Sequence, residues 1–139
     1  MKGMFGIVVA IVLMASFQVH AADTDAVSQA EASAESWLAL VDAAKYAESW
    51  NNAAIVFKGA VTEADWEKAV RSVRAPLGAL KSRRLKSATF ARSLPGAPDG
   101  EYVVLQYYAQ FENKAAAIET VTPMRDPDGT WKVSGYYVK

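Results

Sequence analysis

Carboxylates, tyrosines and arginines are the side chains with which this sequence could do chemistry. The chain has 139 residues and no cysteine, and its one histidine, His20, lies in an N-terminal segment with the features of a secretion signal. Once that segment is removed, Ser-His-Asp and Cys-His catalysis and the usual zinc sites have no residues to use. Acid–base catalysis would then depend on carboxylates, tyrosines or lysines.

Glu119 is the candidate catalytic residue. It lies in an apolar segment, flanked by Ile118 and Val121. If its side chain faces an enclosed space, its pKa should rise and it could act as a general base. Strand alternation leaves this open, because residues 117, 119 and 121 or residues 118, 120 and 122 could form the inward set. The alternative is an ion pair between Glu119 and an arginine or lysine across the strands.

Arg74, Arg83 and Asp42 are the candidate ligand-binding residues. The two arginines flank a Pro-Leu-Gly break in the chain, and Asp42 lies near an expected helical bend. The planar guanidinium group suits a carboxylate or a phosphate, so an anion contact is one interpretation. The other is that the arginines pair with Asp42 or Glu119 and fix a helix to the sheet.

No motif in the sequence indicates a metal or a cofactor. A glycine-rich phosphate loop of the Walker or dinucleotide type is absent. Residues 126–129 (DPDG) are similar to part of a calcium loop, but the glycine comes two residues early and the closing glutamate is missing. We therefore expect these residues to form a plain hairpin turn.

The N-terminus predicts export. Lys2 precedes an apolar run at residues 4–15, and Val19 and Ala21 fit a cleavage site. We expect a signal peptide at residues 1–21, a single mature domain at residues 22–139, and a periplasmic or secreted location. The apolar run is too short to span a bilayer, so no stable membrane span is expected after cleavage.

Charge is balanced in number but separated along the chain. The formal net charge is zero, and removal of Lys2 leaves 14 basic and 15 acidic side chains, so we expect no nucleic-acid partner. Between Lys68 and Pro98, however, there is no acidic residue. Eight basic residues lie in this basic segment: Lys68, Arg71, Arg74, Lys81, Arg83, Arg84, Lys86 and Arg92. They either pair with acidic helices in space or form a face for an anionic ligand or an envelope partner.

Hydrophobic spacing predicts helices first and strands afterwards. Residues 23–58 should form two helices with a bend at 43–45, and a third helix should begin after Thr62 and end near Arg74, before Pro76. Strands are expected at 85–94, 101–112, 116–125 and 130–138. The fold class is therefore α+β, with three N-terminal helices packed on a curved four-stranded antiparallel sheet.

Three tyrosines predict a subunit interface. Tyr102, Tyr108 and Tyr136 fall on the strand faces opposite the most apolar residues. Amphipathic rings on an outer sheet face are common where subunits meet. We expect a homodimer through this face.

Many linked motifs make the chain resemble the DUF4019 family of exported bacterial proteins of unknown function, from about residue 30 to residue 139. The motifs are Trp37-Leu38 with Asp42, Tyr46, Ser49-Trp50, Trp66, 74–78, 82–83, 94–102, Phe111, 119–122, 128–129 and 131–137. The resemblance implies no activity, substrate or catalytic residue. The order of elements is also similar to the NTF2-like (cystatin-related) cone, an architecture that includes both enzymes and binding modules.

Two functional hypotheses follow from these observations. The first is an exported, non-enzymatic binding or interaction module, whose ligand is unknown and could be anionic. The second is a small enzyme that uses Glu119, with a tyrosine donor, for proton transfer or hydrolysis in an NTF2-like pocket. A purely structural envelope protein would have the same sequence features as the first.

Overall fold

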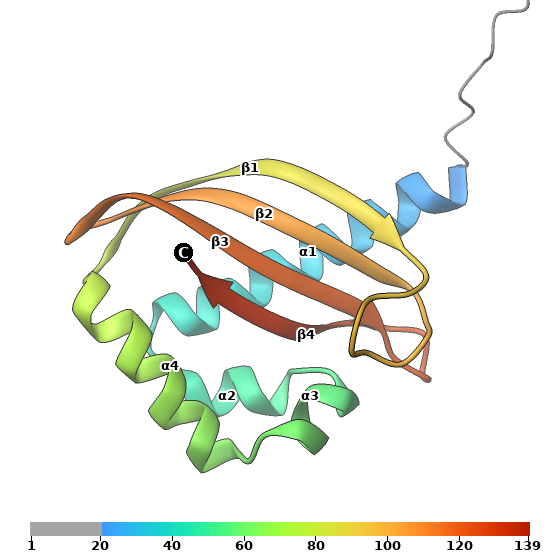
Figure 1. Cartoon of the computed structure of the whole chain (residues 1–139), viewed down its shortest axis with the longest axis horizontal. Coiled ribbons are helices and arrows are strands. Elements are labelled where there is room, and N and C mark those ends of the chain that lie inside the picture. The colour runs from blue at the N-terminus through green and yellow to red at the C-terminus, as the bar shows by residue number, and fades with distance from the viewer. Residues whose placement is uncertain (1–20) are drawn as a thin grey trace, which may run out of the picture.

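The computed structural model describes residues 21–139, so most of the predicted signal peptide, with His20, lies outside the described residues. Four helices precede four strands (Figure 1). The helices are α1 (Ala21–Asp42), α2 (Tyr46–Asn51), α3 (Ile55–Ala60) and α4 (Glu63–Leu77). The strands are β1 (Leu80–Ala91), β2 (Tyr102–Phe111), β3 (Lys114–Arg125) and β4 (Trp131–Val138). The α+β class and the antiparallel sheet are confirmed.

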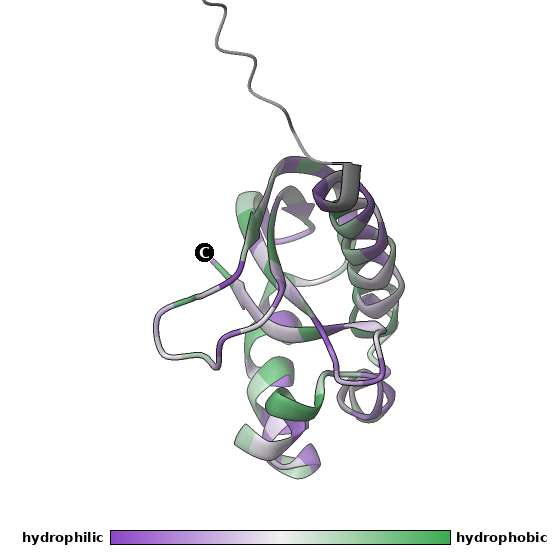
Figure 2. Ribbon diagram, turned by 90° about the vertical axis from the view of Figure 1, so that its right-hand side faces the viewer, coloured by the Kyte–Doolittle hydropathy of each residue, from purple (hydrophilic) through white to green (hydrophobic). Residues whose placement is uncertain are grey.

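The long helix α1 supplies one wall of the hydrophobic core. Its apolar residues at three- and four-residue spacing form a buried stripe, from Ala30 and Ala34 to Trp37, Leu38 and Val41. It contacts all four strands and lies along one face of the curved sheet, while none of the four helices described lies against the opposite face (Figures 1 and 2). The sheet therefore has an inner face, toward α1, and an outer face.

The predicted second helix is two short helices, which corrects the expected count of three. The bend at 43–45 is confirmed and is made by Ala44, which takes a φ of 58°. The chain then leaves the helical conformation again between α2 and α3, where the Ala54 N–H donates to the Val133 carbonyl oxygen of β4 at 2.8 Å. Asn51 and Asn52, both poor helix formers, immediately precede this break.

Helix α4 begins where the sequence predicts and ends later. Thr62 is its N-cap, with its hydroxyl accepting from the Asp65 N–H at 3.2 Å. The helix continues past Arg74 to Leu77, with Pro76 in its last turn, and Gly78 then ends the helix with a φ of 75°. Pro76 has no N–H to donate and disfavours the helical conformation of Ala75, so the last turn forms against the local preference that predicted an end near Arg74.

The sheet is an open meander in which each strand pairs with the next, in the order β1-β2-β3-β4. β1 begins five residues earlier than predicted and ends three residues earlier, because its polar, exposed N-terminal half carries no alternating apolar signal. On β2, alternation from Val103 to Phe111 predicts the buried side chains correctly. On β3, the inward set is Ala117, Glu119 and Val121.

A bulge reverses the phase of β4. Thr122 pairs with Gly135, but its neighbour Pro123 pairs with Val133. Proline cannot donate to the ladder and is typical of such positions. Beyond the bulge Tyr136 faces inward, and Tyr137, which alternation places in the core, is 58% exposed.

The predicted tyrosine face is exposed at one of its three residues. Tyr136 points into the interior, which corrects its predicted place on the outer face. Tyr102 lies on the same side of β2 as Tyr108 by strand alternation, but it is buried, and its hydroxyl donates to the Pro98 carbonyl oxygen in the loop between β1 and β2. Of the three tyrosines, Tyr108 alone is exposed.

Candidate functional site

All four residues singled out from the sequence meet, together with Tyr136, in a cluster that runs from the fully buried Glu119 to the partly exposed Asp42. Arg83 bridges two carboxylates. Its Nε donates to Glu119 Oε1 at 2.6 Å, and its Nη1 donates to Asp42 Oδ2 at 2.8 Å. Arg74 Nη2 donates to Asp42 Oδ1 at 2.8 Å, and the Tyr136 hydroxyl donates to Glu119 Oε2 at 2.5 Å. We call these five residues the ionic network.

Each member of the ionic network comes from a different element. Asp42 is the last residue of α1, at the bend, and Arg74 lies on the buried face of α4 one turn after Val70. Arg83 on β1 and Glu119 on β3 are separated by β2, but the residue beside Arg83 on β2 is Ala109, and Ala109 pairs with Ala117 on β3. Two methyl side chains leave room for the Arg83 guanidinium group to reach Glu119.

The charges in the ionic network stabilise one another. Burial alone would raise the pKa of Asp42, but the hydrogen bonds and positive charges of Arg83 and then Arg74 outweigh it and hold the pKa of Asp42 below its usual value. Burial, followed by the negative charge of Glu119, raises the pKa of Tyr136 well above its usual value. At neutral pH the network therefore holds a charged Asp42, two charged arginines and a protonated Tyr136.

The geometry of the ionic network does not favour Glu119 as a general base. Its side chain is 0% exposed, and each of its oxygens accepts a hydrogen bond. The Arg74 side chain is 5% exposed and stacks on Phe111 at 4.8 Å from the ring centroid. The alternative interpretation, an ion pair that fixes helices to the sheet, describes what these side chains do.

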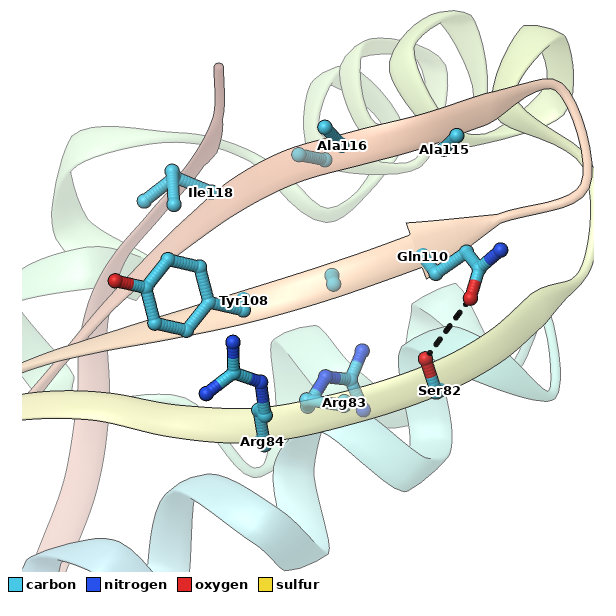
Figure 3. A pocket seen from close by; sticks show the side chains of 10 residues that line it. Ser82, Arg83, Arg84, Tyr108, Gln110, Ala115, Ala116 and Ile118 are labelled. Atoms are coloured by element: carbon cyan, nitrogen blue, oxygen red, sulfur yellow. Dashed lines mark hydrogen bonds between the residues drawn. The ribbon is translucent and has the colours of Figure 1, made fainter.

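A second cluster, which the sequence analysis did not single out, lies on the outer face. A groove of about 450 Å³ crosses β1, β2 and β3 there. Side chains from all three strands line it (Figure 3): Ser82, Arg84, Tyr108, Gln110, Ala115, Ala116 and Ile118. Arg84 Cζ lies 4.3 Å from the Tyr108 ring centroid. We call this the outer groove.

Strand parity could have identified Arg84. Neighbouring residues on a strand point to opposite faces, so an inward Arg83 requires an outward Arg84. Of the two alternatives for the basic segment, pairing with carboxylates is observed for three of its eight residues. Arg74, Arg83 and Arg92 pair with carboxylates, whereas the other five basic residues have no ion pair within the described residues.

The DPDG segment is a hairpin turn, as expected. The Gly129 N–H donates to the Asp126 carbonyl oxygen, and Gly129 has a φ of 84°. Asp128 is occupied by Thr130, whose N–H and hydroxyl both donate to Asp128 Oδ1. Within residues 21–139 no group of three potential metal ligands comes together. None of the helices described is both long enough and apolar enough to cross a bilayer.

The fold and the two clusters of side chains define the class of protein. It is an α+β protein with an open antiparallel meander, an ionic network on the inner face of the sheet and an exposed groove on the outer face. Comparison with protein families then identifies the chain. The profile of a family described as "Protein of unknown function (DUF4019)" matches residues 33–136. The chain belongs to this family. Among curated proteins, none matches the sequence significantly.

Proposed function

We propose that this protein is an exported, non-enzymatic binding module that receives an anionic ligand in the outer groove. The observation that carries the proposal is the guanidinium group of Arg84. It is held over the Tyr108 ring, and no carboxylate pairs with it in the described chain. An arginine that is stacked in place has less freedom to lose on binding, and its planar fork suits a carboxylate or a phosphate.

The enzyme hypothesis has less support from the geometry. A general base needs a free lone pair within reach of substrate. Glu119 is enclosed, and both its oxygens are occupied by Arg83 and Tyr136. Arg74, Arg83 and Asp42 likewise bind one another, so in this proposal the ionic network maintains the sheet that carries the outer groove.

Three further parts of the proposal rest on the sequence. Export to the periplasm or beyond rests on the N-terminal segment. Kinship with the NTF2-like architecture rests on the order of elements, and the curved sheet over one long helix agrees with it. The homodimer through the outer face stays a prediction, in which Tyr108 alone of the three tyrosines could take part.

The test is thermal unfolding of the mature protein with a panel of small anions at constant ionic strength. We expect at least one carboxylate or phosphate to raise the melting temperature of the wild type but not of Arg84→Ala. Arg71→Ala is the matched control, because Arg71 is also exposed and stacks on a tyrosine, Tyr46, but lies outside the groove. If no anion stabilises the protein, or if Arg84→Ala responds like the wild type, the proposal is wrong.

A further inference from the structure

The outer groove has one charged end and one apolar side. Arg84 is the one lining residue whose charge is unpaired, because Arg83, which also borders the groove, is committed to Asp42 and Glu119. Lys86 lies 5.7 Å from the Tyr108 ring centroid but does not line the groove. One free positive charge matches a monoanion better than a dianion, which would leave a negative charge unpaired in the groove.

Polar groups beside Arg84 are neutral. The Ser82 hydroxyl donates to Gln110 Oε1 at 3.4 Å, across the β1–β2 pair. This hydrogen bond occupies the amide oxygen of Gln110. The NH₂ group of the same amide has no protein acceptor among residues 21–139. The Gln110 amide is thus a further uncharged polar group in the groove, and its nitrogen points away from Arg84 (Figure 3).

The apolar side comes from β3. Ala115 and Ala116 end in methyl groups, and the Ile118 side chain lies across from Tyr108 (Figure 3). The hollow exists because these two alanines are short where longer side chains would fill the space. Its volume of about 450 Å³ falls within the range of small-molecule sites, roughly 300–1,000 Å³.

The geometry points to a monocarboxylate with a slim apolar body as the ligand of the outer groove: the carboxylate on Arg84, and the body along Ala116 and Ile118. This inference rests on the proposed function and narrows its ligand class. A carboxylate carries one charge on two coplanar oxygens and so matches the guanidinium fork in both charge and shape. The short side chains of Ala115 and Ala116 leave space beside β3 for the apolar body.

The experiment is a titration of the mature ¹⁵N-labelled protein, followed by NMR, with octanoate, acetate, octanol and octyl phosphate. We expect octanoate to bind about tenfold or more tightly than acetate, because its chain covers apolar surface, and more tightly than octanol and octyl phosphate. The shifted amides should lie on β1, β2 and β3 around the groove.

Two variants test the apolar side of the groove and the guanidinium group of Arg84 separately. Ala116→Leu fills the apolar side while Arg84 stays, so it should weaken octanoate binding about tenfold and leave acetate binding nearly unchanged. Arg84→Lys keeps the charge and loses the fork, so it should weaken both carboxylates. Arg71→Ala is again the control, and amide spectra of each variant report whether the fold is intact.

The outcomes distinguish this inference from the proposed function. If acetate and octanoate bind equally at Arg84, or if octyl phosphate binds best, the protein remains an anion-binding module and the monocarboxylate inference is overturned. If octanol matches octanoate, the charge is not used, and the inference is overturned as well. If none of the four probes binds, the monocarboxylate inference is rejected, and the thermal-unfolding panel of small anions decides the proposed function separately.

Discussion

Glu119 illustrates how a buried charge depends on its partners. Its carboxylate is enclosed and receives hydrogen bonds from Arg83 and Tyr136. Removing a charge from such a pair leaves the partner charge in a poorly solvated position, which costs more than the pair itself contributes. Glu119 therefore matters for stability, even though burying the two charged groups of the ion pair costs desolvation free energy.

We expect Glu119→Gln to lower the free energy of unfolding by about 3 kcal/mol, the cost typical of breaking one side of a buried ion pair. Urea unfolding of the mature protein measures the difference. The control is Glu48→Gln, which removes an exposed carboxylate of α2 and should change stability by less than about 0.5 kcal/mol. Equal stability of Glu119→Gln and the wild type would contradict the structural role of the ionic network.

From the sequence alone, four residues of the ionic network could be predicted. Whether they pair with one another or serve as a catalytic or binding site could not. Glu119, Arg74, Arg83 and Asp42 were all identified, and the ion-pair interpretation was one of two that the residue types allowed. The choice depends on inward or outward orientation, which on β3 was equally compatible with two sets of residues. Arg84 was not predicted as a site residue because its local sequence does not distinguish it from the other exposed basic residues of the basic segment.

The bend after α1 is the element that places Asp42 beside the arginines. The Ala44 N–H donates to the Val41 carbonyl oxygen, and the Lys45 N–H donates to the Leu40 carbonyl oxygen. This pattern ends a helix with one residue in the left-handed region, where glycine is the usual choice. Here that residue is alanine, with a φ of 58°, which strains the backbone.

We expect Ala44→Gly to raise the free energy of unfolding by about 0.5–1 kcal/mol, because glycine adopts the left-handed conformation without a steric penalty. Part of the gain is offset by the greater freedom of glycine in the unfolded chain. Ala43→Gly is the control: Ala43 is exposed and lies next to Ala44 but has no positive φ, so the same substitution there should be neutral or destabilising. Equal effects at the two positions would contradict this account.

Helices and strands were predicted with unequal success for identifiable reasons. The stripe of α1, the Thr62 cap and the alternation of β2 are local patterns, and the structure confirms them. The break between α2 and α3 depends on a hydrogen bond to β4, far away in the sequence. The reversed phase of β4 depends on Pro123 in the neighbouring strand. Both the break and the reversed phase depend on residues in another segment, so the pattern of a single segment cannot predict them.

For the whole molecule, the ionic network links stability to pH. The pKa of Asp42 is lower in the folded state than its usual value of about 3.9. Folding therefore gains stability from the charged Asp42 above that pH, and this gain is lost as the pH falls through the folded-state pKa.

We expect Asp42→Asn to be less stable than the wild type at pH 7, by about 1–3 kcal/mol since Asp42 is partly exposed. The difference should shrink as the pH falls from about 5 toward 2. Chemical denaturation across this range measures it, with Glu48→Gln as the exposed control. A difference that stays constant with pH would show that the loss is one of packing and not of charge.

The aromatic packing around Tyr136 gives the ionic network an optical reporter. The Tyr136 ring meets Trp37 edge to face, with centroids 5.3 Å apart, and Trp37 in turn lies 5.8 Å from Trp66. Because indole emission responds to nearby charges and to water, intrinsic fluorescence of the unlabelled protein will follow any opening of the ionic network. The outer groove has no tryptophan in its lining. Events on the two faces of the sheet can thus be observed separately, by light on one side and by amide shifts on the other.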